Sequence, residues 1–345
     1  MNIKRKIAIA AVPAVMALAS TSVDSKILLM SQEGWEVSFD GAANAFVMKN
    51  SVSDVPTDTA EGNRLAGGFK TFGGVAGGND DTSIVTGLLP NVWGMTLKAP
   101  TANGLDISAR LGLYTHMNGG DNSLGNGQIN LRETSGSVSG SFGTVLVGRS
   151  LGIHQSNAIL NDMLLFGVGA AASANNSNTT LGRIGLGYLY TDFQPQISWT
   201  LPGMDALGGN FGAKIGIFDP NTVTADTAAF SATDKSSPRV EAQITWNGDL
   251  LGTGVGMNLW VDGTYQNTER TAAQATAVQG NRSHLGNGTA ASPETDVDSA
   301  GVGFGTKLTY EGFSLVATGF YGTAQGIRGQ KTQGAATATH ALDDV

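Results

Sequence analysis

The stretch Leu105-Asp106-Ile107-Ser108-Ala109-Arg110-Leu111-Gly112-Leu113 alternates apolar residues with polar or small ones. Its odd-numbered residues are all apolar, whereas the even-numbered residues share the opposite face. A period of two is that of a β-strand, because successive side chains point to opposite faces of a sheet. The stretch therefore predicts a strand with one apolar face and one polar face.

The same alternation returns along the chain. Residues 239–246 place Val, Ala, Ile and Trp opposite Arg, Glu, Gln and Thr, and residues 302–310 behave similarly. Between Arg183 and Leu201 the apolar face changes from even to odd positions, so we expect a bulge near Thr191-Asp192.

Pairs of such stretches are joined by short turns that contain Gly, which predicts hairpins. The pairs are 91–99 with 104–116, 128–138 with 142–150, 182–201 with 210–219, 238–247 with 254–266, and 301–310 with 313–322. Long polar segments separate them, at about 49–82, 117–127, 151–181, 220–237 and 267–300. A lone first strand at Trp35–Val47 brings the predicted count to eleven. Short turns at one end and long loops at the other are typical of an outer-membrane barrel.

The composition excludes several classes of protein. The chain has 345 residues, 49 of them Gly and none Cys, and only 14% are charged. Without Cys there is no disulfide scaffold and no thiolate metal site. The net charge of −8 gives no support for nucleic-acid binding.

The first residues predict export. Lys4, Arg5 and Lys6 precede an apolar run from Ile7, and Ala17-Leu18-Ala19 has the form of a cleavage site. We therefore expect a signal peptide at 1–19 and a barrel domain at 20–345. No later stretch is apolar for long enough to predict a transmembrane helix, so a membrane protein built from this chain would need β-strands.

One segment resembles a known family. Residues 140–152, Gly-Ser-Phe-Gly-Thr-Val-Leu-Val-Gly-Arg-Ser-Leu-Gly, are similar to the S-F-G-x-x-x-x-G-R segment of Gram-negative general porins, and Asn157–Gly169 resembles the loop that follows it. The resemblance implies an all-β fold, a transmembrane antiparallel up-and-down β-barrel of sixteen strands whose third loop folds inward. It further implies a homotrimer in the outer membrane, in contact with lipid and lipopolysaccharide, that passes small hydrophilic solutes and ions by diffusion without a cofactor.

The resemblance also implies residues at the constriction of the pore. Arg149 matches the family's Arg that projects toward the narrowest part, and Asp162 lies where acidic residues commonly face a basic wall. Alternation alone would turn Arg149 toward lipid with Val145 and Val147, unless a bulge at Gly148 turns it inward. Independently of the resemblance, alternation places further cations on polar faces: Lys98, Arg110, Arg132, Arg183, Lys214, Arg239 and Lys307. Each of these could equally be a solvated charge of the wall or its rim.

The ion preference of such a channel stays open. Cations on several strands favour anions at the constriction, whereas acidic loop residues such as Asp80, Asp81 and Asp121 favour cations at the mouths.

The end of the chain departs from the family. It closes with Asp343-Asp344-Val345 instead of a strand with a terminal aromatic residue, and nothing after Tyr321 resembles a strand. Eleven is also an odd number, whereas single-chain bacterial barrels have even numbers. We therefore expect a barrel that is incomplete at its C-terminal end and lacks five strands; the alternative is that the count is wrong.

Other functions have less support in the sequence. His116, His154, His284 and His340 do not form a metal or catalytic motif, so we expect no enzyme and no metal site. Alternatives to a general porin are a substrate-preferring outer-membrane channel and a surface adhesin without channel activity.

Overall fold

The computed structural model describes residues 26–52, 79–116, 129–167, 187–220, 237–269 and 296–323. Most of these residues belong to strands. The strands are β1 (Ile27–Gln32), β2 (Trp35–Ala42), β3 (Phe46–Val52), β4 (Asn79–Val85), β5 (Asn91–Lys98), β6 (Asp106–Thr115), β7 (Ile129–Gly140), β8 (Gly143–Leu151), β9 (Phe193–Thr200), β10 (Met204–Ala206), β11 (Gly209–Phe218), β12 (Arg239–Asp249), β13 (Gly256–Glu269), β14 (Asp296–Tyr310) and β15 (Phe313–Thr323). The short helix α2 (Ser156–Leu160) follows β8. In the described parts of the chain, no helix is long and apolar enough to cross a membrane.

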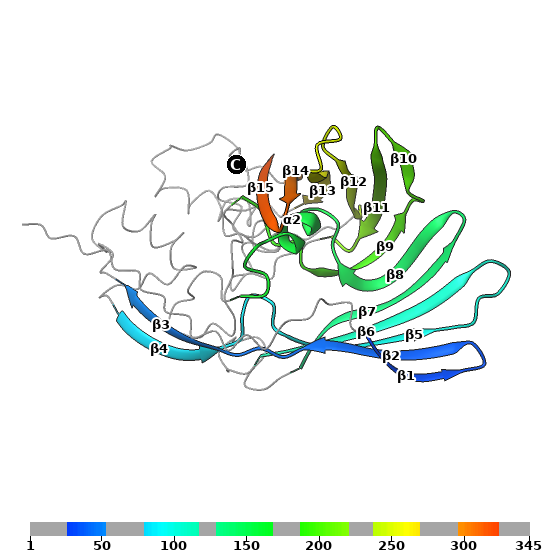
Figure 1. Cartoon of the computed structure of the whole chain (residues 1–345), viewed down its shortest axis with the longest axis horizontal. Coiled ribbons are helices and arrows are strands. Elements are labelled where there is room, and N and C mark those ends of the chain that lie inside the picture. The colour runs from blue at the N-terminus through cyan, green and yellow to red at the C-terminus, as the bar shows by residue number, and fades with distance from the viewer. Residues whose placement is uncertain are drawn as a thin grey trace, which may run out of the picture.

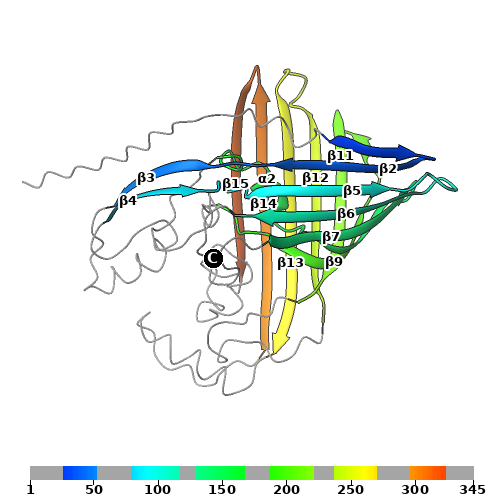
Figure 2. The ribbon, with the colours of Figure 1, turned by 90° about the horizontal axis from the view of Figure 1, so that it is seen from below.

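The strands form one antiparallel meander in chain order. Its path is β1-β2-β5-β6-β7-β8-β9-β11-β12-β13-β14-β15, and β10 pairs with β11 beside β9, which makes 13 strands. β3 and β4 pair separately as a hairpin beyond β2 and β5. The sheet curves around an interior that contains α2 (Figure 1), and the strands at its two ends run in clearly different directions (Figure 2). Within the described sheet, β1 pairs only with β2 and β15 only with β14.

The alternating pattern places polar side chains inside and apolar side chains outside. On β12, Arg239, Glu241 and Gln243 are buried or half-buried, whereas Val240 and Ile244 are exposed. The outer face carries large exposed apolar side chains on many strands, among them Trp93, Met95, Leu97, Ile197, Trp199, Ile215, Ile217, Val261, Val302 and Phe304. The all-β antiparallel up-and-down fold predicted from the alternation is confirmed.

Five short turns share one backbone geometry. In Glu33-Gly34, Asn103-Gly104, Leu207-Gly208, Leu251-Gly252 and Glu311-Gly312, both residues have φ between 43° and 87°. Two consecutive residues with positive φ match the right-handed twist of a hairpin, and Gly adopts this conformation without steric cost. These turns fix the register of the hairpins that they close.

The predicted count of eleven strands was wrong. The strand expected at Trp35–Val47 is not alone, because β1 pairs with β2, and its far end forms the separate strand β3. β4 and β10 were also missed. The residues of β1 are all exposed and do not alternate in polarity, which explains why the period of two did not reveal that strand.

The strand expected at 182–201 begins only at Phe193. Residues 187–192 belong to the connection that precedes it, and Asp192 has φ 57°, so the change of face arises where this connection meets β9 and not at a bulge within one strand. Residues 182–186, the signal peptide at 1–19 and everything beyond 323 lie outside the described residues, so the domain limits remain predictions.

A first prediction concerns the outer face. Val261 lies near the middle of β13 and its side chain is 56% exposed. If this face contacts lipid, Val261→Arg should destabilise the folded protein by about 2–4 kcal/mol, because a cation at the bilayer midplane loses its hydration. The measurement is urea unfolding in lipid vesicles. Asn258→Arg, on the inner face of the same strand, is the control and should cost clearly less; equal effects of the two variants would contradict a lipid-facing outer surface.

Candidate functional site

The third long connection, from Gly152 to Asp192, enters the interior of the curved sheet. We call it the third loop; its residues 152–167 and 187–192 are described. The loop begins with Ile153, His154 and Gln155, which are 0%, 1% and 1% exposed. Two polar side chains and three peptide groups are thus removed from solvent where the chain leaves β8. Such groups are stable only if they are hydrogen-bonded.

Glu241 on β12 binds the first two of these peptide groups. Its Oε2 atom accepts the N–H groups of Ile153 and His154 at 2.7 and 2.8 Å. Its Oε1 atom accepts a hydrogen bond from Nε of Arg239 at 3.1 Å. Both oxygens of this fully buried carboxylate therefore have donors, and the Arg239 guanidinium compensates its charge.

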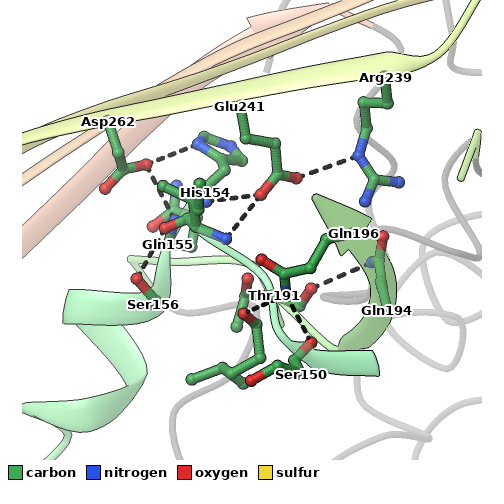
Figure 3. Close-up of polar contacts among 12 residues, drawn as sticks. Ser150, His154, Gln155, Ser156, Thr191, Gln194, Gln196, Arg239, Glu241 and Asp262 are labelled. Atoms are coloured by element: carbon green, nitrogen blue, oxygen red, sulfur yellow. Dashed lines mark hydrogen bonds and ion pairs between the residues drawn. The ribbon is translucent and has the colours of Figure 1, made fainter. Parts of the chain in front are cut away.

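Asp262 on β13 binds the next residue. Its Oδ1 atom accepts the N–H of Gln155 at 2.9 Å and lies 2.6 Å from Nδ1 of His154 (Figure 3). The neighbouring strand has no side chain at this point, because the residue there is Gly303. A Cβ atom on Gly303 would lie 2.6 Å from Oδ1 of Asp262 and 2.7 Å from Nε2 of Gln155. A glycine on β14 thus leaves room for the loop. We call Glu241, Asp262 and the peptide groups of residues 153–155 the carboxylate clamp.

Side-chain amides extend this attachment. Gln243 donates to the carbonyl of Ile153 at 3.3 Å and to the hydroxyl of Ser156 at 3.2 Å. Gln196 on β9 donates to the carbonyls of Ser150 and Leu151 at 3.0 and 2.9 Å. The loop therefore starts from a mount made by β9, which directly follows it in the chain, and by β12 and β13, which are distant from it in sequence.

From this mount the loop reaches the residues that precede β5. Ala158 and Ile159 of α2 form a buried cluster with Leu88 and Tyr188. The N–H of Leu88 donates to the carbonyl of Gly167 at 2.9 Å, and the N–H of Leu89 donates to the carbonyl of Leu165 at 3.1 Å. The described loop thus connects the wall of β12 and β13 with the chain before β5, and it occupies part of the interior (Figure 1). The predicted inward fold of this loop is confirmed.

Asp162 supports the loop itself. It accepts the N–H of Leu164 at 2.9 Å and the hydroxyl of Tyr188. Burial, together with the hydrogen bond and the charge of Asp162, raises the pKa of Tyr188 above its ordinary value. Tyr188 therefore remains a protonated donor, and these contacts of Asp162 lie within the loop.

On the other side of the interior, Arg110 is paired with two acids. Its guanidinium binds both carboxylate oxygens of Asp40 on β2, one of them at 2.9 Å, and lies 3.5 Å from Glu133 on β7. It also donates to Thr96 at 3.2 Å. Arg110 therefore lies on the inner face, as the alternation predicted, but its charge is fully compensated.

Arg132 reaches the interior through a break in the sheet register. β6 and β7 change register between Gly112 and Leu113, where Leu113 pairs with Leu131 and Arg132 is skipped. The Arg132 guanidinium lies 5.0 Å from the ring centroid of Tyr114 and 5.8 Å from that of Phe193. Its Nη1 atom lies 3.5 Å from the hydroxyl of Tyr190.

Arg149 lies on the neighbouring strand β8, where it pairs with Thr134 of β7 and Pro195 of β9. The register of β8 shows no bulge at Gly148, but Gly148 has φ 123°, a conformation that only Gly adopts readily. Arg149 is half-buried, and its Nε atom is buried. Burial raises the pKa of Tyr190 to about 12; the charge of Arg132 acts to lower it, that of Asp192 to raise it and that of Arg149 to lower it.

The structure places the other predicted cations elsewhere. Arg239 belongs to the mount of the third loop and stacks on Phe218 at 5.1 Å. Lys214 on β11 and Lys307 on β14 are half-buried, whereas Lys98 is exposed at the end of β5. Arg183 lies outside the described residues.

Sequence reasoning missed the acids that hold the loop and the wall. Glu241 was placed on the polar face of its strand, but nothing indicated that it binds residues 153 and 154. Asp262, Asp40 and Glu133 were not singled out, and His154 was assigned to no metal or catalytic motif. An acidic residue at an inward position of a predicted strand is the signal that could have found Asp262. Among the described residues, no group of His, Asp and Glu side chains could hold a metal ion.

A second prediction tests the carboxylate clamp. Glu241→Gln removes the charge that compensates buried Arg239, so the free energy of unfolding should fall by about 3–5 kcal/mol. Urea unfolding in vesicles measures this loss. Adding Arg239→Met to Glu241→Gln removes the uncompensated cation and should restore part of the stability; strictly additive losses would show that the two side chains are not coupled.

Comparison with known proteins supports the fold. No protein-family profile matches the sequence, and no curated protein matches it. Among solved structures, the outer membrane channel DcaP of Acinetobacter baumannii is similar with a TM-score of 0.51 at 16% identity, over 85% of this chain and 66% of that one. The chain thus spans slightly less than two thirds of that channel.

Two further structures align more loosely. An anion-selective porin from Comamonas acidovorans has a TM-score of 0.39 at 15% identity, over 84% of this chain and 73% of that one. A loop-deletion mutant of OmpT, an outer membrane protein of Vibrio cholerae, has a TM-score of 0.38 at 12% identity, over 84% and 82%. The strand order, with the likeness to the DcaP channel, shows an all-β antiparallel sheet with an inward third loop.

Proposed function

We propose that this chain forms a water-filled outer-membrane channel through which small hydrophilic solutes and ions diffuse passively, with the third loop as its constriction. The observation that carries the proposal is the carboxylate clamp. It holds a loop inside the curved sheet through two buried acids, three peptide groups and an imidazole. A loop that only covered the outside of a barrel would need no such attachment.

The two faces of the sheet support a membrane location. The outer face is rich in exposed apolar side chains, and the inner face is rich in polar ones. This is the arrangement of a barrel with lipid outside and water or polar side chains inside. Export by a signal peptide at 1–19 and assembly as a homotrimer, in contact with lipid and lipopolysaccharide, belong to the same proposal.

The third loop gives the channel its proposed selectivity by size and charge. The third loop, attached to the inner wall, narrows the aqueous path. Charged side chains on either side of this narrow path act on a passing ion at short distance. A surface adhesin would not require charged side chains on the inner wall.

The third prediction is a measurement of current. The protein extracted from its native membrane should produce stepwise increases in conductance in a planar lipid bilayer, in groups of three if it is a trimer. Deleting residues 157–166, which lie beyond the clamp, should increase the single-channel conductance because the constriction is removed.

The control for this deletion is a change in the hairpin turn at Leu251-Gly252, which joins the ends of β12 and β13. Replacing it with Asn-Gly should leave the conductance unchanged. A protein that is folded, as judged by its heat-sensitive mobility, and yet gives no current would exclude the diffusion channel.

A further inference from the structure

The carboxylate clamp is completed by a side chain whose charge can change near neutral pH, the imidazole of His154. The side chains of Glu241 and Asp262 are fully buried, and those of Arg239 and His154 are nearly so. Arg239 pairs with Glu241 at 3.1 Å. In the described structure, the salt-bridge partner of Asp262 is His154, whose Nδ1 atom lies 2.6 Å from Oδ1 (Figure 3).

The protonation state of His154 therefore decides whether the buried charges balance. With a protonated imidazole, the carboxylates of Glu241 and Asp262 face two cations. With a neutral imidazole, Asp262 keeps its hydrogen bond from the N–H of Gln155 but has no paired cation. A buried carboxylate without a compensating charge is strongly unfavourable, so attachment of the loop favours the protonated imidazole.

Lys214 is another titratable cation near the clamp, but it does not reach Asp262. Lys214 on β11 and Asp262 on β13 pair with opposite sides of Gln243, so strand β12 lies between them. Lys214 is half-buried, and the carboxylate that acts on it is Glu241. Compensation of Asp262 thus depends on the imidazole that contacts it.

The remaining charged groups around the clamp are acids. Asp192, at the end of the third loop, and Asp219, after β11, act on Arg239; the first is half-buried and the second exposed. Their negative charge favours a protonated imidazole further. On β14 and β15, the residues in register with Asp262 are Gly303 and Phe320, which carry no charge.

We propose that His154 makes the attachment of the third loop dependent on pH: the protonated imidazole holds residues 153–155 on β12 and β13, and loss of its proton to solvent releases them and widens the channel. The inference rests on the proposed function, in which this loop is the constriction. The attached loop binds the proton more tightly than the released loop does. The stabilisation is therefore present below about pH 6.5, where a free imidazole is also protonated, and is lost progressively as the pH rises above that value.

A distance between two spin labels tests this release without requiring conduction. The chain has no Cys, so Leu160→Cys and Leu251→Cys provide the only two attachment points. Both side chains are exposed, the first in α2 and the second in the turn between β12 and β13. Pulsed electron paramagnetic resonance of the full-length protein in detergent should give a narrow distance distribution at pH 6 and a broader one at pH 9. The same distribution at both pH values would overturn the proposal.

Two variants of the clamp should fix opposite states. Asp262→Asn should keep the narrow distribution at both pH values, because a neutral amide needs no compensating cation. His154→Gln should keep the broad one, because Asp262 then has no cation. Heat-sensitive mobility shows whether each variant is folded, and the comparison of pH values in the labelled protein does not depend on them.

Two further variants are matched controls. His116→Gln removes an imidazole that lies beside Thr86, outside the clamp, and Lys214→Gln removes the other cation near Glu241. Both should retain the change between pH 6 and pH 9. Loss of the change in either control, with its retention in His154→Gln, would assign the effect to another group and overturn the proposal.

Bilayer currents separate this proposal from the channel itself. In about 1 M KCl, which screens surface charges, the single-channel conductance should rise from pH 6 to pH 9, and the rise should be absent in Asp262→Asn. Stepwise currents together with a distance distribution that does not change with pH would overturn the release and leave the channel intact. A distribution that changes with pH in a protein that gives no current would support the release and contradict the diffusion channel.

Discussion

The structure depends on one constraint: a peptide segment placed inside a curved sheet must have its N–H groups hydrogen-bonded. At residues 153–155 this is done by Glu241 and Asp262, two carboxylates that are themselves buried. Burying a carboxylate is unfavourable, and here the peptide N–H groups, the imidazole of His154 and the guanidinium of Arg239 offset that cost together. Each member of the set is stable only because the others are present.

The constraint also explains the unequal distribution of charge on the inner wall. Where the loop docks, acids face peptide groups and Gly303 leaves the space that the loop needs. Arg110 on β6 is paired with Asp40 and Glu133, whereas Arg132 on β7 lies against the rings of Tyr114 and Phe193. The inner wall therefore holds its cations in different ways, by carboxylates at Arg110 and Arg239 and by aromatic rings at Arg132.

Strands with one apolar face could be predicted from the sequence, because their alternation is a local property. Residues 105–113 and 239–246 show it, and so does the position of Arg110 on the inner face. β1 was not predicted because its side chains do not alternate in polarity. The φ of 123° at Gly148 and the contacts of Glu241, which join residues 87 and 88 positions apart in the chain, are properties of the folded chain. Neither is visible in a pattern of neighbouring residues.

The distance along the chain between the loop and its mount has a consequence for assembly. The hairpins can form from adjacent residues, but the loop cannot attach until β12 and β13 have joined the sheet, and Gln155 meets Asp262 across 107 positions. Contacts of such separation form late, since the intervening chain must first lose its freedom. The loop therefore docks late in folding, on a mount that strands from the second half of the described chain complete.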